Sequence, residues 1–171
     1  MRITMIGAGN VGGTLGRRWA AAGHDVTFGS RRGGDGGDVK GSETLPSNVR
    51  VAPLSESVRG ADVVVLATPW DAARDALLAA GAASGAFDRV TLIDATNPIA
   101  RGLTLLAGEG GASGAEQLQA LVPHAKVVKA FNTTGYENMR DPVYDGVHRS
   151  MMVAMDQQKA RRDPRRGPRT Q

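Results

Sequence analysis

The feature that most constrains the fold of this chain is a glycine-rich turn that follows a short apolar segment near the N-terminus. Residues 2–6 (RITMI) are apolar or β-branched, and the turn 7–12 (GAGNVG) follows them directly. Residues 11–22 then favour a helix, Gly23 is a suitable helix C-cap, and residues 24–28 (HDVTF) predict a second strand. This order predicts a right-handed βαβ unit.

The three glycines of this turn indicate a dinucleotide site. Gly7 permits the tight turn, Gly9 lets the backbone approach a pyrophosphate, and Gly12 allows close packing of helix on strand. The helix that opens at Asn10 and Val11 would then face the phosphates. A GxGxxG pattern alone arises by chance in a chain with 23 glycines, so the prediction depends on the complete βαβ unit around it.

The end of the second strand indicates which dinucleotide binds. A site for NAD(H) has an Asp or Glu there for the ribose 2′-hydroxyl, whereas this chain has Phe28-Gly29-Ser30-Arg31-Arg32. Two guanidinium groups and the Ser30 hydroxyl are suited to a 2′-phosphate. The sequence therefore favours NADP(H); the alternative is that Arg31 and Arg32 are only solvated loop charges.

The rest of the chain predicts an α/β fold of Rossmann type, a doubly wound and mainly parallel sheet with helices on both faces. Residues 1–154 are predicted to form this single NADP-binding domain. Thr68 and Pro69 are predicted as the N-cap and first residue of a helix that continues over 72–83. Glycine-rich loops are expected over 33–41 and 101–114. Further strands are predicted at 49–52, 61–68, 90–94, 126–130 and 150–154, and helices at 54–59 and 115–121.

Charge and composition exclude several functions. Residues 159–171 contain six of the 21 Lys and Arg residues but only one of the 17 Asp and Glu residues. The rest of the chain, with 15 basic and 16 acidic residues, is nearly neutral and does not resemble a specific nucleic-acid binder. Residues 155–171 are expected to be a disordered basic tail, for which non-specific nucleic-acid binding is the alternative role. No cysteine or histidine cluster suggests a metal site. With no signal peptide and no apolar run of about 20 residues, we expect a cytoplasmic protein without membrane contact.

Three loops are expected to meet at the carboxyl edge of the sheet, where ligands of such folds bind. They contain Thr68–Trp70, residues 95–98 and residues 131–134. Asp94 is interpreted as a strand-end hydrogen-bonding residue rather than a catalytic acid, and Trp70 serves either this edge or helix packing. A nicotinamide site with neutral groups suits hydride transfer between two cofactors, in which alignment is the main catalytic task.

The sequence resembles the coenzyme F-420-dependent NADP oxidoreductases over residues 1–154. The resemblance rests on MRITMIGAGNVGGTLGRRWAAAGHDVTFGSRR, ADVVVLATPW and KVVKAFNTTGYENM. It implies hydride exchange between the nicotinamide C4 of NADP(H) and C5 of the deazaflavin coenzyme F-420. Together, motif and resemblance predict cofactor binding by Gly7, Gly9, Asn10, Val11, Gly12, Ser30, Arg31, Arg32, Thr68, Pro69, Ala130 and Asn132, with Thr68, Pro69, Trp70, Asn132 and Thr134 near the nicotinamide.

Two departures from the family pattern leave alternatives open. Asn132 stands where the well-known F-420 enzymes have histidine, and the AFNT segment is also similar to metalloreductase domains that pass electrons from NADPH to a flavin. The acceptor is then F-420, or alternatively a flavin or ferric chelate. The family also continues past residue 154 with helices that complete the acceptor pocket and a homodimer. We therefore hypothesise a truncated or frameshifted C-terminus, and a non-catalytic NADP(H)-binding module is the third alternative.

Overall fold

The structure, a computed structural model, describes residues 1–33, 45–99, 111–148 and 150–155. Most of the loops expected over 33–41 and 101–114, and nearly all of the tail expected over 155–171, lie outside these residues. Among these residues, no helix combines the length and apolar character needed to span a bilayer.

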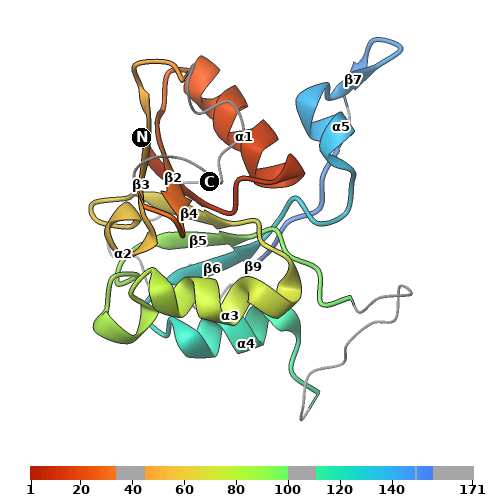
Figure 1. Ribbon diagram of the computed structural model, residues 1–171. Coiled ribbons are helices and arrows are strands. Elements are labelled where there is room, and N and C mark those ends of the chain that lie inside the picture. The colour runs from red at the N-terminus through yellow and green to blue at the C-terminus, as the bar shows by residue number, and fades with distance from the viewer. Residues whose placement is uncertain (34–44, 100–110, 149, 156–171) are drawn as a thin grey trace, which may run out of the picture.

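The centre of the molecule is one twisted sheet of seven described strands (Figure 1). Their order is β3-β2-β1-β4-β5-β6-β9, and all neighbours are parallel except β9, which runs antiparallel to β6. The predicted doubly wound, mainly parallel sheet is therefore confirmed. The strands are β1 (Arg2–Ile6), β2 (Asp25–Ser30), β3 (Val49–Pro53), β4 (Val63–Leu66), β5 (Thr91–Asp94), β6 (Lys126–Lys129) and β9 (Ala154–Met155).

Helices cover both faces of the sheet, as Figure 1 shows. One hydrophobic core, around Phe28 and Met5, lies on the face of α1 and α5. The other, around Leu77 and Leu92, lies on the face of α2, α3 and α4. The helices are α1 (Asn10–Ala21), α2 (Leu54–Ser57), α3 (Trp70–Ala79), α4 (Gly114–Leu121) and α5 (Tyr136–Arg140).

The run of valines in β4 reflects its position in the middle of the sheet. Val64, Val65 and Leu66 are each 0 % exposed, because helices cover both sides of the strand. Val64 belongs to one core and Val65 to the other, so successive side chains alternate between the faces. Burial of each such side chain stabilises the fold by about 1.5–3 kcal/mol.

Glycines let α1 approach the sheet closely. A Cβ atom added to Gly16 would lie 2.6 Å from Cζ of Phe28, and one added to Gly12 would lie 1.9 Å from the carbonyl oxygen of Gly7. The two glycines are four residues apart and therefore share the inner face of the helix. The position of Gly12 in the sequence predicts this packing role, whereas that of Gly16 does not.

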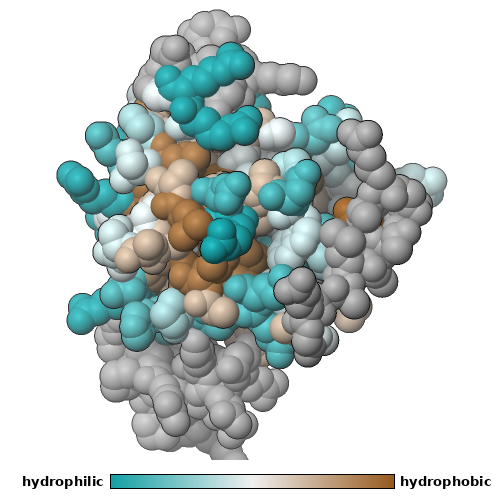
Figure 2. Space-filling view, turned by 60° about the horizontal axis from the view of Figure 1, so that its bottom comes forward, coloured by the Kyte–Doolittle hydropathy of each residue, from teal (hydrophilic) through white to brown (hydrophobic). Residues whose placement is uncertain are grey.

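The side of the molecule that carries α3 and α4 is shown in Figure 2. Hydrophobic side chains gather there in a strip between polar ones. Trp70, Ala82, Ala86 and Leu121 are only partly buried and pack against the core beneath these helices. They form the outer layer of that core.

Helix α3 differs from its predicted bounds at both ends. Its N-cap is Pro69 and not Thr68, whose side chain makes no capping hydrogen bond. The helix ends at Ala79, and a separate 3-10 helix follows at Ala82–Ser84. Gly81 breaks the predicted continuous helix over 72–83 because it has a left-handed φ of 97°.

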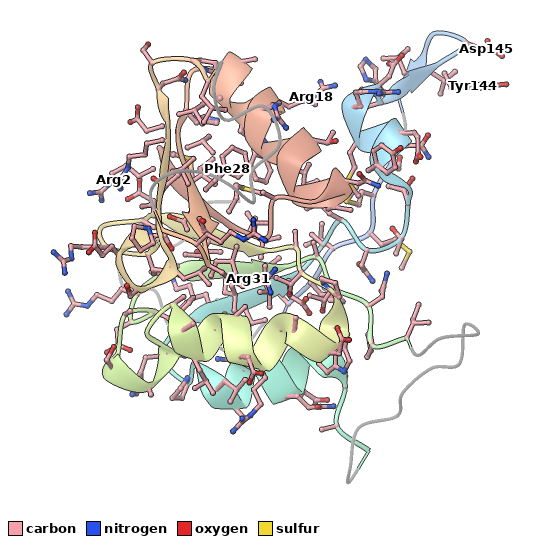
Figure 3. All side chains as sticks on the ribbon, in the orientation of Figure 1. Arg2, Arg18, Phe28, Arg31, Tyr144 and Asp145 are labelled. Carbon is pink, nitrogen blue, oxygen red and sulfur yellow. The ribbon has the colours of Figure 1, made fainter. Side chains whose placement is uncertain are left out.

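The segment after β6 holds elements that the sequence analysis missed. Helix α5 is followed by a hairpin of β7 (Val143–Tyr144) and β8 (Val147–His148), which projects from the body of the molecule in Figures 1 and 3. Asp145 and Gly146 form its turn with φ values of 48° and 77°, a typical Asp-Gly hairpin turn. Of the strand predicted at 150–154 only Ala154 lies in a strand, β9, whose second residue, Met155, was predicted to begin the tail.

An exposed ion pair at the amino end of the sheet gives a pH prediction. Arg2 donates to Asp62 at 3.0 Å, and this hydrogen bond lowers the pKa of Asp62 from its ordinary 3.8. A lowered carboxyl pKa stabilises the folded state above pH 3.8, and this contribution is lost as the pH falls through the folded-state pKa. We expect Asp62→Asn to lower Tm slightly at pH 7 and to match the wild type at pH 2. Thermal denaturation at both pH values, with Asp88→Asn as an exposed control, measures this; an undiminished difference at pH 2 would contradict it.

Candidate cofactor site

The candidate site lies at the carboxyl edge of the sheet, between β1 and β4. Strands β2 and β4 flank β1 on opposite sides, so the chain changes direction along the sheet at this point. Ligands of open α/β sheets bind at such a switch point. The loops that meet there lead from β1 into α1 and from β4 into α3, and those after β5 and β6 lie beside them.

The three glycines of the first loop have different roles in the structure. Gly7 has a φ of 101°, and a Cβ atom on it would lie 2.6 Å from the carbonyl oxygen of Ala67. Gly12 is equally restricted by Gly7 itself. Around Gly9, by contrast, a Cβ atom would meet no described atom within 4 Å. The protein requires Gly7 and Gly12 for its own packing, whereas Gly9 borders open space of the kind that an approaching ligand needs.

The first turn of α1 presents donors to this space. Its N-cap is Gly9, which has no side chain for capping, and no acidic residue lies in the turn. The first backbone hydrogen bond at this end runs from the Gly13 N–H to the Gly9 carbonyl at 2.7 Å. The preceding N–H groups, of Asn10, Val11 and Gly12, lie at the positive end of the helix dipole, an arrangement suited to a pyrophosphate.

Thr68, at the end of β4, has a buried hydroxyl without a hydrogen-bond partner in the described part of the chain. Such a group costs about 1–3 kcal/mol unless a water or ligand satisfies it. Pro69 is exposed beside it. Trp70 packs on α4, since a Cβ on Gly114 would lie 3.2 Å from its ring, which favours the packing interpretation of Trp70.

At the end of β2, Ser30 is almost completely buried and its Oγ accepts a hydrogen bond from the Arg32 N–H at 3.1 Å. The hydroxyl therefore orders the turn that carries Arg31 and Arg32, both of which are exposed. Figure 3 shows Arg31 in the space between the ribbons of α1 and α3, whereas Arg2 lies at the opposite end of the sheet. The two arginines are accessible to a 2′-phosphate bound at this edge.

Asp94, at the end of β5, is the centre of a buried polar network. Its Oδ1 accepts hydrogen bonds from the backbone N–H and the hydroxyl of Thr96, at 2.9 and 2.7 Å. Its Oδ2 pairs with the Lys129 ammonium at 2.8 Å, and Lys129 also donates to the Thr96 carbonyl. Asp94 therefore fastens the loop after β5, which matches its interpretation as a strand-end hydrogen-bonding residue. Lys129 was missed, although a lysine inside the apolar segment KVVKA indicates a buried partner.

Two asparagines join the loops after β5 and β6. The Asn97 side chain donates to the backbone carbonyl of Asn132 at 2.9 Å, and the Asn132 side chain donates to the side-chain oxygen Oδ1 of Asn97 at 3.3 Å. Ala130 is buried, and its N–H donates to the Asp94 carbonyl at 3.1 Å. The structure thus brings Ala130 and Asn132 to the same edge as Asp94.

Thr134 faces a different region, a cavity of about 190 Å³ between α1 and α5. Its hydroxyl accepts a hydrogen bond from Asn138 at 2.6 Å. Trp19 and Phe131 also line the cavity and pack edge to face, with ring centroids 5.8 Å apart. Thr134 thus supports α5 and this cavity, while Phe131 connects the cavity to the carboxyl edge.

Comparison with known families agrees with this geometry. The model of the family described as coenzyme F-420-dependent NADP oxidoreductase matches residues 2–98, which contain β1 to β5 and the edge loops at Thr68–Trp70 and 95–98. The chain belongs to this family. It is therefore an NADP-dependent oxidoreductase by family, and its Rossmann-type fold is the one predicted. No curated protein matches the sequence.

Solved structures extend the similarity beyond the family match. A proposed F-420-dependent NADP reductase from Arthrobacter sp. FB24 is 31 % identical, with a TM-score of 0.74, and the alignment covers 94 % of this chain and 76 % of that one. A hypothetical protein from Sinorhizobium meliloti is 28 % identical, with a TM-score of 0.76 and coverages of 95 % and 76 %. Glycerol-3-phosphate dehydrogenase from Coxiella burnetii, at 13 % identity, a TM-score of 0.64 and coverages of 94 % and 48 %, shows the shared fold alone.

Proposed function

We propose that this NADP oxidoreductase transfers a hydride between NADP(H) and the deazaflavin coenzyme F-420. The observation that supports NADP(H) as the cofactor is the open space at Gly9. It is bordered by the start of α1, which has no side-chain cap, and by the Thr68 hydroxyl, which has no partner among the described residues. These groups fit a phosphate-bearing cofactor. The choice of F-420 as the hydride acceptor rests on the description of the family and of the Arthrobacter relative.

Different residues of this site would bind different parts of the cofactor. The backbone N–H groups of Asn10 and Val11 would hold the pyrophosphate. The Ser30 turn would present Arg31 and Arg32 to the 2′-phosphate, where guanidinium groups can bind two oxygens at once. Thr68 would donate its free hydroxyl hydrogen, and the loops after β5 and β6 would flank the nicotinamide.

When bound, NADPH supplies a hydride from its nicotinamide C4, and with one proton it converts oxidised F-420 to the reduced form. The described residues expected beside the nicotinamide offer mainly neutral groups, because the Asp94 carboxylate is paired with Thr96 and Lys129. Their contribution would be orientation of the two rings at about 3–3.5 Å. The proton would come from solvent water rather than from a side chain.

The decisive experiment is an anaerobic spectrophotometric assay of F-420 reduction with NADPH and, in parallel, with NADH. We expect turnover with NADPH and much slower turnover with NADH. Turnover with neither donor, in a protein that still binds NADP⁺, would contradict F-420 as acceptor. Loss of NADP⁺ binding as well would contradict the whole proposal.

A flavin or a ferric chelate is the second candidate acceptor. It is favoured by Asn132, which stands where the well-known F-420 enzymes have histidine and whose amide contacts Asn97. The same assay with flavin mononucleotide and ferric citrate distinguishes these acceptors. NADPH binding without turnover of any acceptor would favour a non-catalytic binding module.

Replacement of both Arg31 and Arg32 by alanine is expected to reduce affinity for NADP⁺ while leaving affinity for NAD⁺ unchanged. Loss of one or two charged hydrogen bonds, at about 1.5–3 kcal/mol each, corresponds to about 10- to 100-fold or more. Titration calorimetry with both nucleotides measures this. Arg59→Ala, an exposed arginine at the other end of the sheet, is the matched control. Equal loss for both nucleotides would contradict recognition of the 2′-phosphate.

A further inference from the structure

We propose that Lys129 is a positioning residue for hydride transfer: acting through Asp94 and Thr96, its ammonium group fixes the two loops beside the nicotinamide. The inference rests on the proposed NADP(H) function and extends it to a residue that the cofactor motifs do not include. Lys129 lies at the end of β6, directly opposite Asp94 in the register of the sheet. It would act without touching the reacting atoms.

The contacts of Lys129 join two loops at one point. The ammonium lies 2.8 Å from Oδ2 of Asp94 and also donates to the carbonyl oxygen of Thr96. Asp94 in turn accepts from the Thr96 N–H and hydroxyl. One cation therefore holds both the last residue of β5 and the backbone two residues beyond it.

Burial makes this network sensitive to the loss of any member. Asp94 is 0 % exposed and the Lys129 side chain is 17 % exposed. A buried carboxylate without a counter-charge is costly, so the two charges are retained together.

The network continues into the second loop. Beyond Thr96, Asn97 exchanges two hydrogen bonds with Asn132, which lies three residues after Lys129. Phe131, which lies between Lys129 and Asn132 in the sequence, has a left-handed φ of 63°. This backbone conformation is unfavourable for a bulky side chain and persists only because the surrounding structure holds it. The loops after β5 and β6 are thus held together at both ends, by Lys129 at the base and by the two asparagines above.

This arrangement separates two halves of the cofactor site. The pyrophosphate and 2′-phosphate groups would bind at Gly9 and at the Ser30 turn, on β1 and β2, whereas Lys129 supports loops on β5 and β6. Loss of Lys129 should therefore alter the alignment of the rings more than the affinity for the nucleotide. A misplacement of about 1 Å can reduce a rate by about 100-fold.

The test compares Lys129→Met with the double variant Asp94→Asn/Lys129→Met, because the single variant leaves a buried charge and can fail to fold. Lys126→Met is the control, since it removes the same charge from the exposed start of β6. Thr96→Val removes one hydroxyl from the network and keeps the ion pair. Each variant is characterised by Tm, by its Kd for NADP⁺, by kcat and KM, and by the deuterium isotope effect with 4-deuterated NADPH.

For the double variant we expect a recovered Tm, a Kd for NADP⁺ close to that of the wild type, a kcat lowered by about 100-fold and an increased isotope effect. Thr96→Val should show a smaller change in the same direction. A purely structural role predicts that turnover recovers together with Tm when both charges are removed, and that result would overturn the proposal. A lowered kcat in Lys126→Met would overturn it as well.

Hydrogen exchange of the backbone amides at 95–97, 99 and 131–134 separates this inference from the identity of the acceptor. We expect NADP⁺ to protect these amides in the wild type and to protect them less in the double variant, even if F-420 is not the acceptor. Equal protection in both proteins would overturn the positioning role. Absence of protection in the wild type would overturn both this inference and the proposed nicotinamide site.

Discussion

Replacement of Gly12 by alanine is expected to destabilise the fold by more than about 3 kcal/mol, beyond the usual cost of overpacking. The added Cβ would lie 1.9 Å from the Gly7 carbonyl oxygen and 3.2 Å from Cβ of Ala67. The nearest atom belongs to the backbone and not to a side chain that could change its rotamer. The loop that contains it is already restricted, because Gly7 has a φ of 101°. Alanine gains about 1 kcal/mol over glycine from helix propensity, which is too little to offset this clash.

Urea denaturation followed by circular dichroism measures this effect, and Gly9→Ala in the same loop is the matched control. Its Cβ meets no described atom within 4 Å, so its stability should fall by no more than about 1 kcal/mol, the range of an N-cap change. A Gly12→Ala protein as stable as the wild type would show that α1 can move away from β1. The close packing described here would then not be required for folding.

The sequence was sufficient to predict the strands, glycine turn and helix that form the site, because the residue patterns that indicate them are local. Gly7 and Gly12 stand between a strand and a helix, and the structure gives each the steric role expected from that position. The apolar run that contains β4 likewise predicted a strand at 61–68, and the structure buries its valines between helices on both faces. In each case the residue type reflects a constraint from the adjacent backbone or from simple burial.

Other parts of the site depend on contacts between residues distant in sequence. Lys129 and Asp94 are 35 residues apart, and only the register of β5 with β6 makes them partners. Gly16 is required because the Phe28 ring lies against it, a contact that helix periodicity alone does not reveal. Thr68 and Pro69 form a standard helix-start pattern, but the helix begins one residue later, and the Thr68 hydroxyl has no partner among the described residues.

Replacement of Gly9 by valine is expected to abolish NADP⁺ binding while the protein remains folded. The φ of Gly9 is −71°, which any residue can adopt, so backbone strain does not oppose the change. The branched side chain would occupy the open space beside the start of α1 and keep phosphate oxygens away from the N–H groups there. Loss of two charged hydrogen bonds, at about 1.5–3 kcal/mol each, corresponds to about 100-fold or more in affinity.

Titration calorimetry with NADP⁺ and thermal denaturation of the same samples test this prediction together. Gly9→Ala should give an intermediate affinity, because its smaller side chain blocks less of the space. The contrast with Gly12→Ala is the informative result: one glycine of the motif serves the ligand and the other serves the fold, so one variant should lose binding alone and the other stability. A Gly9→Val protein that binds NADP⁺ as the wild type does would place the pyrophosphate away from α1 and contradict the proposed site.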